Sequence, residues 1–219
     1  MDTGSFPPTL NATTIALIPE GESQTYMKDW RSIALCNVIY KVVANRLKIV
    51  LNKCISDSQY AFVPGRSILD NAMAAIEIIH YMKSKVKGKL GDVALKFDIS
   101  KAYDRIDWNY LKRVMLKMGF FDIWINWISM CIETVDYSVL VNGNASGPII
   151  SGRGLRQGDP LSPYLFIICA EGLSALIRKA KARGEINGVK IAPRLQLFHI
   201  YCLRIAFYFS VQTGIKLRR

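Results

Sequence analysis

The chain has 219 residues, 51% of them apolar, with a formal net charge of +12 and a sequence pI near 9.6. This length and apolar content suffice for the core of one domain or one and a half. A chain this basic points to a polyanionic partner, nucleic acid before an anionic membrane, although solubility is another explanation. The five cysteines are widely spaced without a C-x-x-C pair, and there are only two histidines, which argues against a zinc site.

No apolar run reaches ~18 uninterrupted residues, so neither a transmembrane helix nor a membrane partner is expected. The odd number of cysteines and the lack of a secretory segment at the start indicate a reducing, intracellular compartment, the cytoplasm or the nucleus. The sequence gives no indication of an oligomeric state.

Hydrophobic periodicity predicts three elements in the first part of the chain, a strand over 13–18 and helices over 37–54 and 68–85. A loop over 56–67 joins the two helices. The side chains expected to form the apolar stripe of the first helix are Val38, Val42, Leu47, Val50 and Leu51.

The second part of the chain is predicted to contain, in order, a strand over 93–97, a helix over 101–118 capped by Ser100, a helix over 122–134, a hairpin over 137–151 turning at Asn142-Gly143, a helix over 162–183 and a strand over 187–191. The stretch 193–219 has weak periodicity and no predicted element. Because strands and helices alternate irregularly and the hairpin is antiparallel, the predicted fold class is α+β.

The first candidate for chemistry is Asp98, at the end of the predicted strand and just before a helix. A carboxylate at such an edge is held rigidly and is open to ligands, and phosphoryl transfer uses carboxylates to hold Mg²⁺. Taken alone, the same residue is more often an ordinary turn cap. Asp104 and Asp107 fit the first turn of a helix, where negative charge is favoured by the helix dipole, so we interpret them as structural.

A glycine-rich stretch over 152–160, here called the glycine loop, is the second candidate. Its glycines allow the backbone to approach a ligand closely, and Arg153 and Arg156 supply charge for phosphate. Gln157 can both donate and accept hydrogen bonds beside a base pair. A basic surface turn before a helix is the alternative, but the density of glycine, proline and arginine favours a ligand-binding loop.

Five ordered segments together resemble a known family. LKFDISKAYDRIDW (95–108) and GLRQGDPLSPYLF (154–166) resemble the palm motifs of reverse transcriptases of non-LTR retrotransposons, the LINE-like elements, in a plant-like version. The segments that resemble the fingers motifs of the same family are LNATTIALIP (10–19), DWRSIALCNVIYKVVANRL (29–47) and SQYAFVPGRSILDNA (58–72). The resemblance implies an RNA-directed DNA polymerase of right-hand architecture. Fingers would occupy 1–92 and a partial palm 93–192, the thumb would be absent, and 193–219 would be an aberrant tail.

The resemblance also implies a metal site and its cofactor, Mg²⁺. Asp98 matches the first metal-binding and catalytic aspartate of the palm, and Ile99 would offer its backbone carbonyl to the metal.

Further roles implied by the resemblance concern the nucleotide and the template. Tyr103 matches the aromatic residue under the sugar of the incoming nucleotide, and Gln157 and Gly158 match the loop that packs against nucleotide and template base. The other positions carried over are Arg31, Lys41 and Arg66 for the nucleotide, and Arg156, Pro160 and Ser162 for the template. The implied partners are an RNA template, an RNA–DNA hybrid and deoxynucleotide triphosphates.

One departure from the family is large. The palm of the family has a later hairpin with an F/Y-A-D-D core, which supplies the second metal-binding aspartate, whereas this chain has no Asp or Glu after Glu185. The resemblance therefore implies a polymerase with little or no activity as written, and whether the chain is an enzyme stays open. One hypothesis for the tail is a shift of reading frame near Arg194. The alternatives are a basic, non-catalytic nucleic-acid-binding module and a non-functional relic of a retroelement.

Overall fold

The computed structural model describes residues 11–19, 25–26, 29–36, 38–85, 94, 99–142, 144–186, 189–192 and 195–197. The chain divides into two compact units, each built from two stretches of sequence. The first unit comprises Met1–Cys54 and Lys101–Cys169, and the second comprises Ile55–Ser100 and Ala170–Arg219. The division into fingers and palm at residue 92 concerns function and stays a prediction.

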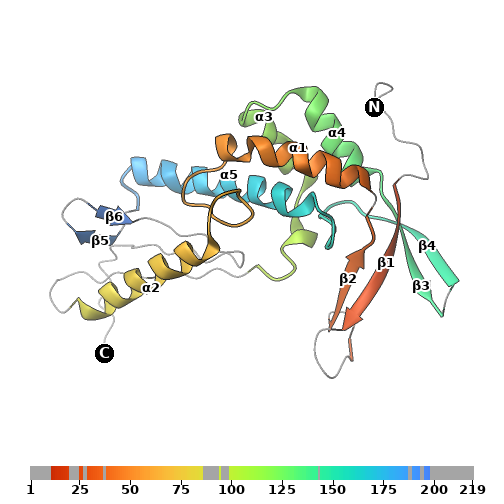
Figure 1. The fold of residues 1–219 in the computed structure, drawn as a ribbon, viewed down its shortest axis with the longest axis horizontal. Coiled ribbons are helices and arrows are strands. Elements are labelled where there is room, and N and C mark those ends of the chain that lie inside the picture. The colour runs from red at the N-terminus through yellow and green to blue at the C-terminus, as the bar shows by residue number, and fades with distance from the viewer. Residues whose placement is uncertain are drawn as a thin grey trace. The chain divides into compact units, whose positions relative to one another are not determined.

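A mixed sheet of four strands, in the order β2-β1-β3-β4, organises the first unit (Figure 1). The strands are β1 (Ala12–Pro19), β2 (Trp30–Ala34), β3 (Asp136–Val141) and β4 (Asn144–Ile150). β1 pairs antiparallel with β2 and parallel with β3, so Ile15 lies between Ala34 and Val139. The strand predicted over 13–18 and the predicted hairpin are confirmed, and Asn142 at the hairpin turn has a φ of +51°.

Strand β2 was not predicted. It has five residues, and only Ala34 is buried, so it carries no clear alternation of apolar and polar side chains. The strand forms because its backbone pairs with β1 over the register Ile15–Pro19 against Trp30–Ala34. Such pairing between strands is invisible to local periodicity.

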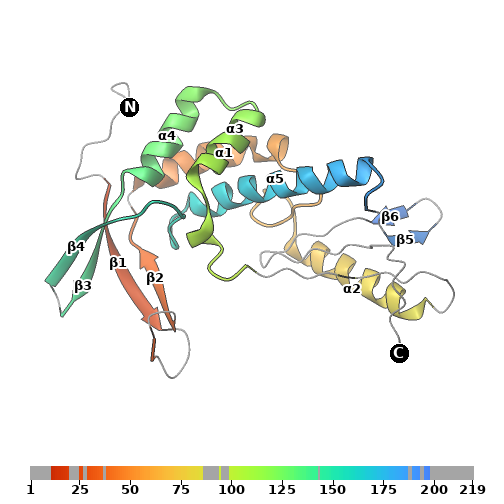
Figure 2. The same cartoon turned by 180° about the vertical axis from the view of Figure 1, so that it is seen from behind.

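The helices of the first unit gather beside its sheet (Figures 1 and 2). They are α1 (Val38–Cys54), the 3-10 turn η3 (Tyr103–Arg105), α3 (Trp108–Lys117), α4 (Asp122–Glu133) and the start of α5 (Ser162–Ala182) as far as Cys169. The largest side chains that these helices and the turn before α5 bury completely include Leu47, Leu51, Leu111, Met115, Ile128, Leu161 and Leu165. The helices predicted over 37–54, 122–134 and 162–183 are confirmed within a few residues.

Helix α1 buries Leu47 and Leu51 of the predicted stripe, but the rest of its buried face differs from the predicted one. Its buried side chains are Tyr40, Val43, Ala44, Leu47 and Leu51. These positions share one side of a helix with 3.6 residues per turn. The predicted core residues Val38 and Val42 are instead 73% and 45% exposed. α1 is apolar on more than one side, so its periodicity predicted the helix correctly but not its orientation.

The predicted helix over 101–118 is wrong in its first part. Lys101 has a φ of +51°, a short 3-10 turn follows, and Ile106 returns to extended backbone. The carbonyls of Tyr103 and Ile106 accept hydrogen bonds from the N–H groups of Leu155 (2.9 Å) and Gly154 (2.8 Å). Because the glycine loop occupies these carbonyls, the regular helix starts only at Trp108.

Asp107, rather than Ser100, caps α3. Its Oδ1 accepts a hydrogen bond from the N–H of Tyr110 at 2.7 Å, and its backbone is extended, as in other N-cap residues. At the other end Gly119 has a φ of +88°, which a glycine adopts without strain, and the predicted stop there is confirmed.

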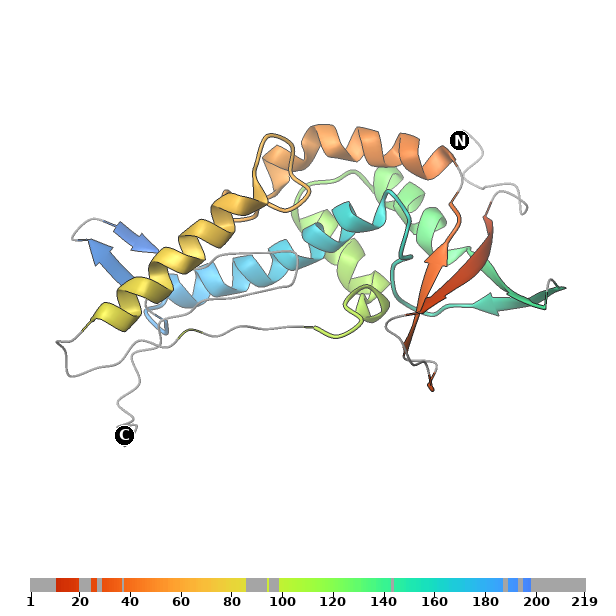
Figure 3. The ribbon, with the colours of Figure 1, turned by 60° about the horizontal axis from the view of Figure 1, so that its bottom comes forward.

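The second unit contains α2 (Ile68–Ser84), the rest of α5 and a small hairpin of β5 (Val189–Ala192) and β6 (Leu195–Leu197), which lies beside α2 (Figure 3). The side chain of Ser67 caps α2 by accepting from the N–H of Leu69 at 3.2 Å. The second predicted helix and the last predicted strand are confirmed, whereas the lack of any element over 193–219 is wrong at β6.

Two further predictions are the strand over 93–97 and the lack of a transmembrane helix. The strand predicted over 93–97 lies outside the described residues, apart from Ala94, which belongs to no strand. Across the described part of the chain, no helix has the length and apolar character needed to cross a membrane.

The cap of α3 gives a first prediction. Asp107→Ala removes the acceptor for the Tyr110 N–H, so we expect the free energy of unfolding to fall by about 1 kcal/mol in urea denaturation. Asp104→Ala is the matched control, since it removes the same charge from an exposed residue that caps no helix; we expect a change within about 0.5 kcal/mol. Equal losses in both variants would contradict the assigned cap.

Candidate functional site

The glycine loop is anchored by an ion pair inside the first unit. Arg156 Nη2 lies 2.7 Å from Asp159 Oδ2, and the two side chains are only 3% and 2% exposed. The guanidinium also lies over the Tyr40 ring, 3.9 Å from its centroid, and donates to the carbonyl of Cys131 at 3.0 Å. Asp159 Oδ1 accepts from the N–H of Leu161 at 2.8 Å. A buried pair of charges is tolerated because its hydrogen-bonding capacity is met in this way.

Burial raises the pKa of Asp159 and of two cysteines near the ion pair. It raises the pKa of the Asp159 carboxyl, while the Arg156 guanidinium and the Leu161 N–H act against that rise. Burial also raises the pKa of Cys131 to about 12 and that of Cys36 to about 11. Both thiols are therefore protonated near neutral pH, and neither is an activated nucleophile.

The two residues between Arg156 and Asp159 are held against β2. The N–H of Ala34 donates to the carbonyl of Gln157 at 2.9 Å. Gly158 has a φ of +95°, and a Cβ there would lie 2.9 Å from Ile33 Cγ2 and 3.1 Å from the Ala34 carbonyl oxygen. Only glycine fits this position without a shift of the strand. Gln157 keeps an exposed side chain although its backbone is fixed.

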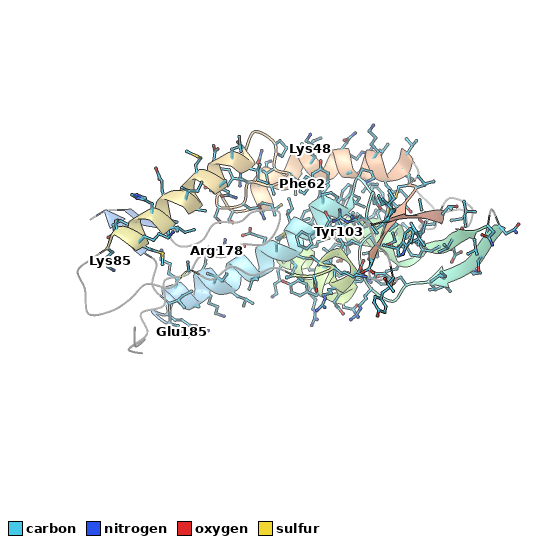
Figure 4. All side chains as sticks on the ribbon, turned by 90° about the horizontal axis from the view of Figure 1, so that it is seen from below. Lys48, Phe62, Lys85, Tyr103, Arg178 and Glu185 are labelled. Carbon is cyan, nitrogen blue, oxygen red and sulfur yellow. The ribbon has the colours of Figure 1, made fainter. Side chains whose placement is uncertain are left out.

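The start of the glycine loop is held on its other side by η3 and α3. Besides the two bonds to the carbonyls of Tyr103 and Ile106, Trp108 Nε1 donates to the carbonyl of Gly154 at 2.7 Å. Tyr103, labelled in Figure 4, packs its ring against Phe166 with 5.3 Å between centroids. Two backbone segments far apart in the sequence thus meet at the loop.

A pocket of about 370 Å³ opens between these anchors. Its apolar lining includes Ile15, Ala34 and Leu155, and its polar lining includes Ser32, Asp104, Tyr137, Ser151, Arg153 and Gln157. A small-molecule site typically has a volume of ~300–1,000 Å³ and a few convergent polar groups, so this pocket is large enough for part of a nucleotide.

The structure brings together some of the predicted site residues. Arg156 and Gln157 line the pocket, with Gly158 next in the chain. Arg31 is exposed on β2 beside the pocket residue Ser32, and Lys41 is exposed on α1. Their predicted roles toward the nucleotide stay predictions.

The residues predicted to bind template are mostly enclosed. The Arg156 guanidinium points to interior partners, Ser162 is 2% exposed at the start of α5, and Pro160 is half-buried. As described, Arg156 holds the loop from within, and a template contact by this residue stays a prediction.

Arg66 belongs to the second unit, where it fastens its own loop. Its Nη1 donates to the carbonyls of Ser56 and Gln59, each at 2.6 Å, and Nη2 lies 3.4 Å from Asp57. These bonds fix the turn before α2. A role of Arg66 toward the nucleotide stays a prediction.

Sequence reasoning missed Ser32 and Tyr137 and interpreted Asp104 as structural, although all three line the pocket. Ser32 and Tyr137 enter it from strands β2 and β3, on either side of β1. No motif marks them, because their proximity depends on the strand order alone. Asp104 is brought in by the 3-10 turn that replaces the predicted helix.

The predicted metal site includes one described residue. Ile99 is described and exposed, whereas Asp98 lies outside the described residues. Among the residues that the structure describes, no three His, Cys, Asp or Glu side chains form a group fit to hold a metal ion. The described side chains alone therefore do not make the metal site.

Comparison with known proteins decides the family. Residues 18–201 match the family described as reverse transcriptase (RNA-dependent DNA polymerase). The chain belongs to this family. Reverse transcriptases in general use a divalent metal ion.

Two relatives confirm the predicted resemblance to non-LTR retrotransposons. The chain is 31% identical over 180 residues to a transposon TX1 protein of Xenopus laevis, covering 80% of this chain and 14% of that protein. It is 23% identical over 197 residues to the Pol polyprotein of the R2 retrotransposable element of Popillia japonica, covering 88% of this chain and 27% of that one. This reverse transcriptase sequence thus spans well under a third of either relative.

A solved structure confirms the α+β fold of this reverse transcriptase chain. Telomerase from Candida Tropicalis, determined in complex with a fragment of telomeric RNA, superposes with a TM-score of 0.64 at 15% sequence identity. The match covers 95% of this chain and 37% of that one. The fingers-and-palm fold class expected from the motifs is therefore correct.

The ion pair yields a second prediction. Arg156→Met would leave the Asp159 carboxylate buried without its cation, so we expect the free energy of unfolding to fall by about 3–5 kcal/mol in urea denaturation. Arg153→Met is the matched control, because Arg153 is exposed in the same loop; we expect less than about 0.5 kcal/mol.

A double-mutant cycle isolates the pair. Arg156→Met combined with Asp159→Asn should cost less than the sum of the two single substitutions, since the second removes the charge that the first leaves unpaired. Additive losses would mean that the two side chains stabilise the loop independently of each other.

Proposed function

We propose that this chain binds an RNA template paired with a DNA primer, together with a deoxynucleotide triphosphate, as part of an RNA-directed DNA polymerase of a non-LTR retrotransposon. As its sequence stands, it extends a primer little or not at all. Its retained activity is therefore binding, which also covers the alternative of a non-catalytic nucleic-acid-binding module.

The observation that carries the binding proposal is the pocket beneath the glycine loop. The loop backbone is fixed on both sides, while Gln157 and Arg153 keep exposed side chains among the residues that line the pocket. A guanidinium suits phosphate oxygens and an amide suits a base edge, so rigid backbone and free polar side chains support nucleotide binding. The net charge of +12 supports contact with the nucleic-acid backbone.

Tyr103 lies beside the pocket without lining it. Its ring is held by Phe166, and its backbone carbonyl is bonded to Leu155 of the glycine loop. Its proposed role under the sugar of an incoming nucleotide rests on the resemblance of the motif.

The proposed weak catalysis follows from the lack of a second metal-binding aspartate in the sequence. In this family a divalent metal, proposed as Mg²⁺, neutralises charge that develops on the phosphates in the transition state. Asp98 and the backbone carbonyl of Ile99 are the groups proposed to hold it. The sequence offers no carboxylate after Glu185, so one aspartate would have to serve where a two-metal centre uses at least two.

The test of function is primer extension on poly-rA with oligo-dT and Mg²⁺, comparing the chain with its Asp98→Ala variant. We expect no extension from either protein. Extension that disappears in the variant would overturn the proposed loss of catalysis and would give Asp98 its catalytic role.

Binding is measured on the same preparations by fluorescence anisotropy with a labelled RNA–DNA hybrid at several salt concentrations. We expect affinity that falls with salt, and Arg153→Ala should reduce the slope of log K against log salt by about 0.9, the value of one phosphate contact. Arg113→Ala is the control because it removes an exposed charge from α3 outside the pocket. It should change the slope of log K against log salt less than Arg153→Ala does. Folded protein that does not bind the hybrid would refute the proposed function.

A further inference from the structure

The first unit has a second pocket whose chemistry differs from that of the first. It has a volume of about 410 Å³ and lies between the C-terminal half of α1 and the turn that joins α3 to α4. Its lining is mainly apolar, with Val50 on α1 and Phe121 and Ile123 on the opposite wall. We call it the apolar pocket. None of the residues of the glycine loop lines it.

Two large apolar side chains that line the apolar pocket are mostly exposed to solvent. Phe121 is 82% exposed and Ile123 is 63% exposed. Phe121 is also the N-cap of α4 and makes no side-chain cap bond, although Ser, Thr, Asp or Asn stabilises that position best. An exposed aromatic side chain that makes no cap hydrogen bond and does not pack in the core indicates a surface that binds another molecule.

The α1 wall of the apolar pocket carries two cations at a regular spacing. Arg46, Val50 and Lys53 follow one another at i, i+4 and i+7, so they lie on one side of the helix. Among the described residues neither Arg46 nor Lys53 forms an ion pair, and no acidic side chain lines the pocket. The complement of this wall is an apolar ridge flanked by two carboxylates seven residues apart, about 10 Å along a helix.

Helix α2 presents that complement. Leu69, Met73 and Ile76 stand at i, i+4 and i+7 and are 69%, 64% and 63% exposed, on the side opposite the buried Ile78. Asp70 and Glu77 lie along one side of this ridge, seven residues apart, and both are exposed. In the described part of the chain neither carboxylate has an ion-pair partner.

We propose that the apolar pocket binds helix α2 of a second copy of this chain, with Leu69, Met73 and Ile76 in the pocket and Asp70 and Glu77 against Arg46 and Lys53. In a twofold dimer each copy offers one pocket and one α2, so the contact forms twice. The matching spacing of opposite charges supports α2 as the occupant, and binding within a single chain would leave the protein monomeric in the test below. Single-stranded nucleic acid is the other occupant that cations beside aromatic rings could bind, and loss of the dimer on nuclease treatment would indicate it.

The proposal is tested by sedimentation velocity on nuclease-treated protein from dilute to concentrated solution. We expect a monomer–dimer equilibrium for the wild-type chain. Arg46→Glu with Lys53→Glu, and separately Asp70→Lys with Glu77→Lys, should each raise the dimer dissociation constant at least about tenfold through like-charge contacts. The variant that combines all four substitutions keeps the wild-type net charge and should dimerise again.

The control matched to the Arg46/Lys53 variant is Lys48→Glu with Arg113→Glu, which makes the same change of net charge at exposed residues outside the apolar pocket; Lys48 is labelled on α1 in Figure 4. We expect this variant to dimerise like the wild type. Far-ultraviolet circular dichroism confirms that each variant is folded before it is compared.

Three results would overturn the proposal. The first is a wild-type chain that stays monomeric, or whose dimer disappears after nuclease treatment. The second is a control variant that dissociates as readily as the Arg46/Lys53 and Asp70/Glu77 variants. The third is a folded four-substitution variant that stays monomeric while the wild type forms dimers.

Discussion

The ion pair between Arg156 and Asp159 is the constraint on which the first unit depends. Taking two charges out of water is costly, and their attraction offsets that cost only when the remaining donors and acceptors are also satisfied. Arg156 meets this condition with groups from two helices, the Tyr40 ring on α1 and the Cys131 carbonyl on α4. Asp159 meets it with the Leu161 N–H at the entrance to α5. Two residues three apart in the glycine loop therefore connect this loop to the helices α1, α4 and α5.

The consequences of this anchor extend along the loop in both directions. Because residues 156 and 159 are fixed, the peptide between them lies against β2, where Ala34 donates to Gln157 and Gly158 leaves no room for a side chain. Toward the N-terminus, the N–H groups of Gly154 and Leu155 donate to the carbonyls of Ile106 and Tyr103. The pocket of about 370 Å³ under the loop, here called the polar pocket, is lined in part by the same residues, so its position depends on the core interaction of Arg156 with Asp159.

The two pockets of the first unit separate two kinds of recognition. The polar pocket combines glycine backbone, hydroxyl, amide and guanidinium groups, which suit phosphate and base edges. The apolar pocket combines aromatic and aliphatic side chains with two cations and suits an apolar ridge with acidic flanks. The cations of this basic chain thus suit different ligands in the two pockets, since the groups around each guanidinium or ammonium decide what it can bind.

The amino-acid sequence by itself determined the family and most of the helices. Five motifs in order identified a reverse transcriptase, and repeats of 3.6 residues identified α1, α2 and the later part of the helix that became α3, because both signals depend on neighbours along the chain. The helices α4 and α5 were also predicted from the sequence. Strand β2, the late start of α3 and the choice of Tyr40 over Val38 for the core were decided only by tertiary structure. So was the burial of Arg156, which the sequence had indicated as a ligand for phosphate or template. Each of these features depends on a hydrogen bond, a strand partner or a packing partner that local periodicity cannot specify.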